Sequence, residues 1–166
     1  MPSSPCASQV IKYKGLFNYS GFLQGIRGWF SSNDYLWQED LNKYRASSDG
    51  GEHEVKMVGE RKINEYIKYK ISVWIRAWNI KEVEVIQHGE KVKMTDARVY
   101  IEIDTSYDTD YQELFEKNAF LKGLRDFYEK KIIKRIIGDH WEDNLVLKLI
   151  SLVGFIKGYL KLEETV

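Results

Sequence analysis

The three histidines are the first candidates for acid–base chemistry or metal binding. His53 lies between Glu52 and Glu54, His88 lies in a glycine-containing turn, and His140 follows an aspartate. No two of them have the four-residue spacing that directs two imidazoles of one helix to one metal ion. We therefore interpret all three as solvated surface residues. Whether His53 and His88 approach each other across a sheet stays open.

A cluster of carboxylates is the second candidate group. Asp104, Asp108 and Asp110 occur in the segment DTSYDTD, and carboxylate oxygens are the ligands that hard cations prefer. The spacing lacks the glycine and the final glutamate of an EF-hand loop. Asp and Thr before a helix are ordinary capping and turn residues. We therefore predict capping roles, with neither a metal nor a cofactor.

Nucleophilic catalysis is not indicated by any motif. The chain has no G-x-S-x-G segment, and its single cysteine, Cys6, has no histidine close to it in the sequence. Gly21, Gly25 and Gly28 do not have the G-x-G-x-x-G spacing of a phosphate-binding loop. The sequence names no catalytic residue, and we lean towards a protein that is not an enzyme.

Residues 66–78, YIKYKISVWIRAW, are expected to form the central strand of the fold. Ile71, Val73 and Ile75 alternate here with aromatic and charged residues. A strand places such alternating sets on opposite faces of a sheet, whereas a helix would spread both around its axis. The aliphatic face is predicted to pack against helices.

The neighbouring segments predict an antiparallel meander of about six strands, because every connection between them is short. Turns rich in Gly, Asn and Asp are expected at 46–51, 79–81, 87–90 and 95–96. The predicted strands cover residues 10–17, 35–45, 52–63, 66–78, 82–88, 91–94 and 97–105.

Three segments have the spacing of amphipathic helices. An early helix begins after Asn18 or Ser20, either of which can cap it. Two long helices are expected at 111–137 and 145–160, separated by Gly138 and a capping box that starts at Asp139. Segregated strands and helices indicate the α+β class, with the C-terminal helices packed on one face of the sheet. We expect a disordered tail at 1–8 and a single domain at 9–163.

This order of elements resembles the helix-grip architecture of the START/polyketide-cyclase superfamily. There, a curved antiparallel sheet wraps a long C-terminal helix, often around an apolar cavity. The chain departs from that pattern in having one early helix rather than two and two late helices rather than one. The resemblance implies a sheet that grips the C-terminal helices.

A second resemblance is local. The segments KGLFNYSGF (14–22), NEYIKYKI (64–71) and FLKGLRDFYEKKIIKR (120–135) are similar to parts of small uncharacterised archaeal proteins. That similarity implies a cytoplasmic protein and transfers no function. The opening residues, MPSSPCASQ, also lack the positive and apolar regions of a signal peptide. We therefore expect a cytoplasmic location, with peripheral membrane contact left open.

The first functional hypothesis is a non-enzymatic module that binds a lipid-like or other hydrophobic ligand in an apolar cavity. Such a cavity would lie between the aliphatic face of the sheet and the last helix. Its predicted lining is Ile71, Val73, Ile75, Val99 and Ile101 from the sheet with Leu149, Val153 and Ile156 from the helix. An enzyme of the same superfamily ranks below this hypothesis, because aliphatic residues supply no polar chemistry.

The alternative hypothesis is an interaction protein. If their strands are neighbours, Trp74, Arg76 and Trp78 form one patch with Arg98 and Tyr100, and such residues are enriched in interface hot spots. A covering helix or loop would instead make the rings part of the core. A second version uses a basic amphipathic helix at a membrane surface, through Lys130, Lys131, Lys134 and Arg135.

The charge composition indicates which classes of partner to expect. Lys and Arg number 25 and so do Asp and Glu, which gives a formal net charge of zero. That balance does not favour nucleic acid as a partner. The expected partners are a hydrophobic small molecule, another protein or a second copy of this chain.

Overall fold

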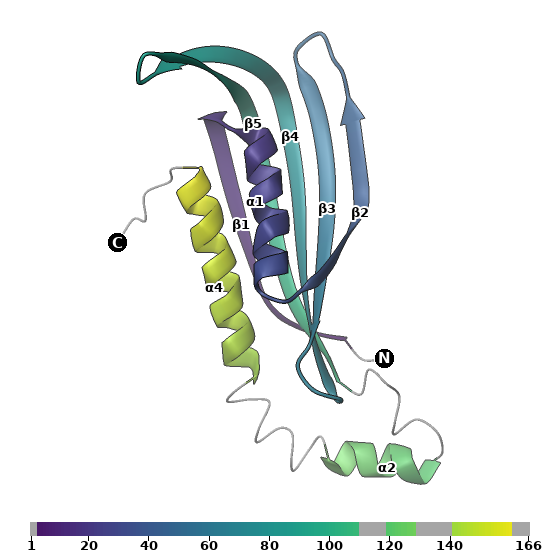
Figure 1. The fold of residues 1–166 in the computed structure, drawn as a ribbon. Coiled ribbons are helices and arrows are strands. Elements are labelled where there is room, and N and C mark those ends of the chain that lie inside the picture. Colours follow the sequence, from purple (N-terminus) through teal and green to yellow (C-terminus); the bar gives the residue numbers. More distant parts are fainter. Residues whose placement is uncertain (1–2, 110–118, 129–140, 161–166) are drawn as a thin grey trace.

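A five-stranded antiparallel sheet with helices on one face forms the body of the protein (Figure 1). The computed structural model describes residues 3–109, 119–128 and 141–160. Its elements are β1 (Ser3–Phe17), α1 (Tyr19–Ser32), β2 (Leu36–Arg45), β3 (Gly51–Lys62), β4 (Ile67–Gln87), β5 (Glu90–Thr109), α2 (Ala119–Tyr128) and α4 (Glu142–Tyr159). The predicted α+β class with an antiparallel sheet is confirmed.

The strand order is β1-β5-β4-β3-β2. Strands β2 to β5 form a meander, and β1 pairs with β5 at the far edge. Helix α1 connects the two edge strands and therefore crosses one face of the sheet, where α4 lies beside it (Figure 1). Both helices cover this inner face, and the described helices leave the opposite, outer face uncovered.

The sheet has five strands rather than about six, because two of the breaks predicted between the seven strand segments are absent. Strand β4 continues through 79–81, where Asn79 has a φ of 54° and the register shifts between Trp78 and Lys81. The predicted end of the central strand is therefore a β-bulge. The turn predicted at 95–96 is also wrong, because Thr95 and Asp96 pair with β4. The hairpin at 87–90 is confirmed, with positive φ at its two central residues.

Strand β1 begins at Ser3, so residues 3–8, predicted as a tail, pair with β5. The side chain of Thr105 secures this segment. Its Oγ1 atom donates to the Ala7 carbonyl at 2.7 Å and accepts from the Ala7 amide at 3.0 Å. The composition of the segment gives no sign of this pairing, because the partner lies almost a hundred residues away.

The core lies between the inner face and the two helices. Cross-strand rows of aliphatic residues form its floor, and one row runs through Ile11, Ile101, Ile75 and Val55, all buried. Each fully buried aliphatic side chain contributes about 1.5–3 kcal/mol relative to an exposed one. The helices complete the cluster with Phe22, Ile26 and Phe30 of α1 and Leu145, Leu149, Leu152 and Ile156 of α4.

The helix predictions hold in part. Asn18 caps α1, its Oδ1 accepting from the Gly21 amide at 3.0 Å, and the last predicted helix is α4. The predicted helix at 111–137 includes α2, which lies beyond the end of the sheet rather than on its face (Figure 1). Its remaining residues, Gly138 and Asp139 lie outside the described residues. A helix-grip arrangement is not established by this structure.

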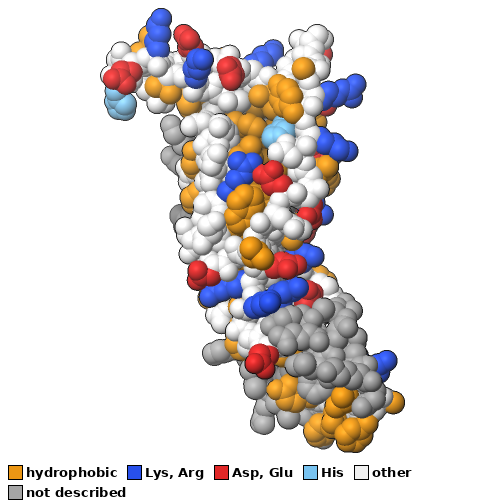
Figure 2. Space-filling model, turned by 45° about the vertical axis from the view of Figure 1, so that its right-hand side comes forward, with side chains coloured by type: hydrophobic (Ala, Val, Ile, Leu, Met, Phe, Trp, Pro, Cys, Tyr) orange, Lys and Arg blue, Asp and Glu red, His pale blue; other side chains and the backbone are white. Residues whose placement is uncertain are grey.

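Helix α2 carries hydrophobic side chains at the surface, and they gather at the lower end of the molecule in Figure 2. Phe120 is among the most exposed large apolar residues, and Leu124 and Phe127 are also exposed. Among the described helices, none is both long enough and apolar enough to cross a membrane.

Candidate interface on the outer sheet face

The outer face brings together the five residues predicted as an interface. Alternation along β4 places Trp74, Arg76 and Trp78 on this face. Strands β4 and β5 are direct neighbours, with Arg76 opposite Tyr100 and Trp78 opposite Arg98. The five residues therefore form one surface cluster, as expected if the two strands were adjacent.

Arg76 lies between the two indole rings. Its Cζ atom is 5.3 Å from the ring centroid of Trp74 and 5.2 Å from that of Trp78. Both distances are typical of cation–π contacts, each worth about 0.5–1 kcal/mol at an exposed site. Tyr100 meets Trp74 edge-on, with ring centroids 6.4 Å apart. These contacts favour the clustered arrangement of the four side chains.

Glu54 forms a hydrogen bond with the indole of Trp74. The Nε1 atom of Trp74 donates to Glu54 Oε1 at 2.9 Å. Arg76 is exposed and the two indoles are half-buried, and none of the described helices lies over them (Figure 1). Within the described part of the chain, the rings are therefore a surface feature and not part of the core.

Two hollows flank this cluster. One, of about 390 Å³, is lined by Lys12, Lys14, Arg98, Tyr100 and Trp78, and by β1 and β5 backbone. The other, of about 250 Å³, lies across β2, β3 and β4, where its charged lining is Lys43, Arg45, Arg76, Glu52 and Glu54. Trp78 borders both hollows. A ligand on either side of the ring could therefore contact it.

No protein-family model matches this chain, and no curated protein matches its sequence. The function must therefore be inferred from the chemistry of the site, since a shared fold alone would not establish it.

The residues predicted to line an apolar cavity are packed in the core. Ile71, Val73, Ile75 and Ile101 are 0% exposed, so no space as large as a water molecule adjoins these side chains. Val99, Leu149 and Ile156 are buried in the same cluster, and Val153 packs against it while partly exposed. A hydrophobic ligand would have to displace these side chains. Its existence stays a prediction, which native mass spectrometry of the purified protein can test.

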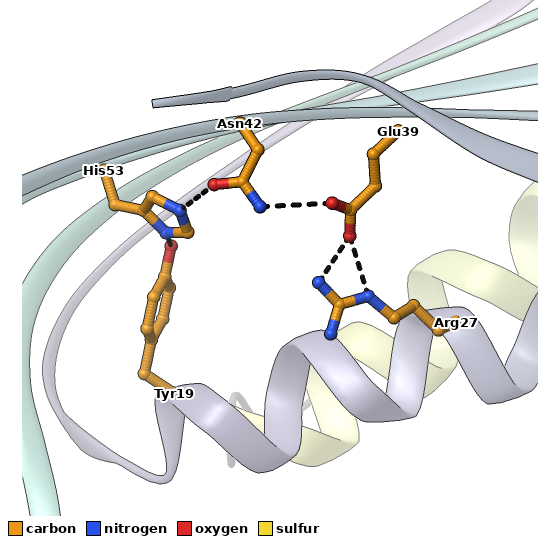
Figure 3. Close-up of polar contacts among 5 residues, drawn as sticks. All are labelled: Tyr19, Arg27, Glu39, Asn42 and His53. Carbon is orange, nitrogen blue, oxygen red and sulfur yellow. Dashed lines mark hydrogen bonds and ion pairs between the residues drawn. The ribbon is translucent and has the colours of Figure 1, made fainter. Parts of the chain in front are cut away.

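A chain of polar contacts joins α1 to the edge of the sheet, and the sequence did not reveal it (Figure 3). The hydroxyl oxygen of Tyr19 lies 2.6 Å from Nδ1 of His53, and Nε2 of His53 lies 2.7 Å from Oδ1 of Asn42. Asn42 Nδ2 donates to Glu39 at 3.1 Å, and Arg27 forms an ion pair with the same carboxylate. His53 is therefore not a freely solvated residue, contrary to the sequence-based interpretation.

The hydrogen bonds among these five residues are those expected of a neutral His53 imidazole. Asn42 Oδ1 can only accept, so His53 donates from Nε2 and accepts from the Tyr19 hydroxyl at Nδ1. Burial lowers the pKa of His53, outweighing the nearby Glu39, and burial also raises the pKa of Tyr19. The Tyr19–His53 hydrogen bond therefore connects α1 to the sheet, and the raised pKa of Tyr19 keeps its hydroxyl protonated at neutral pH.

The contribution of His53 to stability should depend on pH. A folded-state pKa below the unfolded value of about 6.5 means that the unfolded chain binds the proton more readily. The stabilising contribution is thus present above about pH 6.5 and decreases as the pH falls below it. Urea denaturation across this range should show a steeper loss of stability on acidification for the wild type than for His53→Asn. Parallel curves would contradict the prediction.

The other titratable candidates of the sequence do not form a site in the described residues. His88 is exposed at the tip of the β4–β5 hairpin. Asp104 and Asp108 belong to β5, so their predicted role as helix caps is wrong, and Asp108 lies 3.8 Å from Lys68. No group of metal-binding side chains occurs in the part of the chain that the structure describes. His140, Asp110 and the basic residues at 130–135 fall outside it.

Proposed function

We infer that the protein is a non-catalytic binding module whose outer sheet face holds an anionic macromolecule. The observation that supports this proposal is a concentration of positive charge around Arg76 and Trp78. Two adjacent cross-strand rows contain six Lys or Arg residues and two Glu residues, in a chain with zero net charge. We call these two rows the cationic band. The first row is Lys12, Tyr100, Arg76, Glu54 and Lys43. The second begins with Lys14, Arg98 and Trp78 and continues, across a register shift between β4 and β3, with the paired residues Glu52 and Arg45, which line the same hollow as Trp78.

The cations of the band lie close enough to act together. Positions on neighbouring strands are about 4.8 Å apart and positions two strands apart about 10 Å, which is comparable to the screening length of about 8 Å at physiological salt. Lys14 lies directly opposite Arg98 on the adjacent strand. Like charges in that position destabilise a sheet. A bound anion would remove this repulsion, which gives the arrangement a function that folding alone does not require.

These positive charges are also available to a partner. Within the described residues, none of the six cations of the band forms an ion pair, whereas Arg27 and Lys68 elsewhere on the protein do. Arg76 contacts the two indoles through cation–π interactions. Cation–π contacts leave guanidinium N–H groups able to donate to an anion.

Retention on immobilised heparin tests this function, because heparin is a polyanion without aromatic bases. The variant Lys12→Gln/Lys14→Gln removes two cations of the band from β1. Its matched control is Lys91→Gln/Lys93→Gln, which removes two exposed lysines with the same spacing near the β4–β5 turn. We expect the band variant to elute at clearly lower salt than the wild type and the control to elute close to the wild type.

Two results would count against the proposal. One is elution of the wild type at the salt concentration of the loading buffer, which would mean that the face does not bind polyanions. The other is an equal shift for the band variant and the control, which would mean that retention depends on overall charge and not on the band. Circular dichroism of each variant establishes that the fold is retained.

A further inference from the structure

The cationic band contains aromatic rings as well as charges, and this combination narrows the class of anion. Trp78 and Tyr100 occupy positions within the two rows, between cations contributed by neighbouring strands. Heparin-like chains and acidic peptides offer charge but no flat rings. Nucleotide bases stack on aromatic side chains while their phosphates contact Lys and Arg.

The shape of the face favours a single strand over a duplex. None of the described helices lies on this face to enter a groove (Figure 1), whereas an unpaired strand can turn its bases onto the rings. The hollows on the two sides of Trp78, of about 390 and 250 Å³, provide space for such groups. A flat layer of lipid headgroups would leave them empty.

The dimensions of the band also fit a short single strand. From β1 to β2 the sheet spans four inter-strand spacings, about 19 Å at about 4.8 Å each. That span is comparable to the smallest sites of single-strand-binding domains, about four nucleotides. Lys12 and Lys14 lie at one end of the band and Lys43 and Arg45 at the other, with the rings between them.

We propose that the cationic band binds single-stranded nucleic acid laid across the strands, with bases stacked on Trp78 and Tyr100 and phosphates held by the surrounding Lys and Arg side chains. The proposal rests on the function inferred above and specifies its partner. The zero net charge of the chain does not conflict with it, because association depends on the local field of the face and not on the total charge.

The test is fluorescence anisotropy with labelled oligonucleotides of about 12 residues, within the usual range of site sizes. Oligothymidylate and oligouridylate represent single-stranded DNA and RNA. A strand of the same length without bases, carrying the phosphates alone, separates stacking from charge, and a duplex of the same length tests strand selectivity. We expect at least one of the two base-containing single strands to bind more tightly than both the abasic strand and the duplex.

Trp78→Ala is the decisive variant. Loss of one stacking platform should weaken binding of the preferred single strand by about 5- to 150-fold, while binding of the abasic strand stays unchanged. Trp78→Phe retains an aromatic face and should remain within a few-fold of the wild type, which separates stacking from any disturbance of the fold. For Lys12→Gln/Lys14→Gln, the slope of log Kd against log salt should decrease by about one to two.

Three outcomes would overturn this inference while leaving the heparin result intact. They are equal affinity for the abasic and base-containing strands, an unchanged affinity in Trp78→Ala, and binding of phosphatidylserine vesicles or polyglutamate in preference to every oligonucleotide. Failure of the wild type to bind heparin as well as the oligonucleotides would overturn both the inference and the proposed function.

Discussion

Replacement of Phe30 by alanine is expected to lower the free energy of unfolding by about 3–5 kcal/mol. Phe30 is fully buried on α1, and its ring packs edge-on against Trp29 and against Tyr35 at centroid distances of 5.7 and 6.0 Å. Truncation would leave a void between α1 and β3 that this aromatic cluster cannot easily close. Urea denaturation followed by circular dichroism measures the effect.

The control for this variant is Phe120→Ala. Phe120 lies on α2 with 74% of its surface exposed, so its truncation should change stability by no more than about 0.5 kcal/mol. Equal losses for the two variants would mean that Phe30 does not connect α1 to the sheet as described.

Gly59 on β3 provides an independent test of the same contact. A Cβ atom at this position would lie 2.5 and 2.6 Å from two carbons of the Phe30 ring, so Gly59→Ala should cost about 1–3 kcal/mol by overpacking. In the Phe30→Ala background the added methyl group meets empty space, and the cost should be smaller by at least about 0.5 kcal/mol. An additive double-mutant cycle would contradict the packing.

The alternation of side chains was enough to predict most of the sheet. Residues 66–78 and 97–105 were assigned to strands correctly because one face of each is buried under helices, and burial of one face imposes a period of two. Asn18 was recognisable as a helix cap because capping is a local interaction. These features depend on residues that are close in the sequence.

The errors concern features decided by distant residues. Asn79 can end a strand or form a bulge, and only the continuing partner strand β5 selects the bulge. Residues 3–8 have the composition of a tail, yet they complete a sheet edge that β5 would otherwise expose. The sequence predicts a solvated His53 because no two histidines have the spacing of a metal site, whereas its partners in the structure, Tyr19 and Asn42, come from α1 and β2.

The candidate interface was predictable only as a set of residues. Alternation alone placed Trp74, Arg76 and Trp78 on one face, but the cationic band consists of residues from all five strands. The concentration of positive charge follows only from the strand register, which places Lys12 and Lys14 of β1 in the same cross-strand rows as residues of β5 and β4. The total charge of the chain, which at the level of sequence argues against a nucleic-acid partner, averages this local concentration of positive charge to zero.

Replacement of Ile75 by alanine is expected to cost about 2–5 kcal/mol. Ile75 lies at the centre of the inner face between Val55 and Ile101, and all three residues are 0% exposed. The matched control is Ile86→Ala, the same substitution on the same strand at a residue that is 75% exposed, which should be nearly neutral. Chemical denaturation of both variants measures the difference.

The same variant also tests the hydrophobic-ligand hypothesis. If the wild-type core is closely packed around Ile75, truncation creates a dry apolar cavity that a small molecule such as benzene can occupy. Benzene should then raise the Tm of Ile75→Ala and leave that of the wild type unchanged, because only the variant offers it space. Equal stabilisation of both proteins would mean that the wild-type core already has room for a ligand, and the cavity between sheet and helix would become the better-supported binding site.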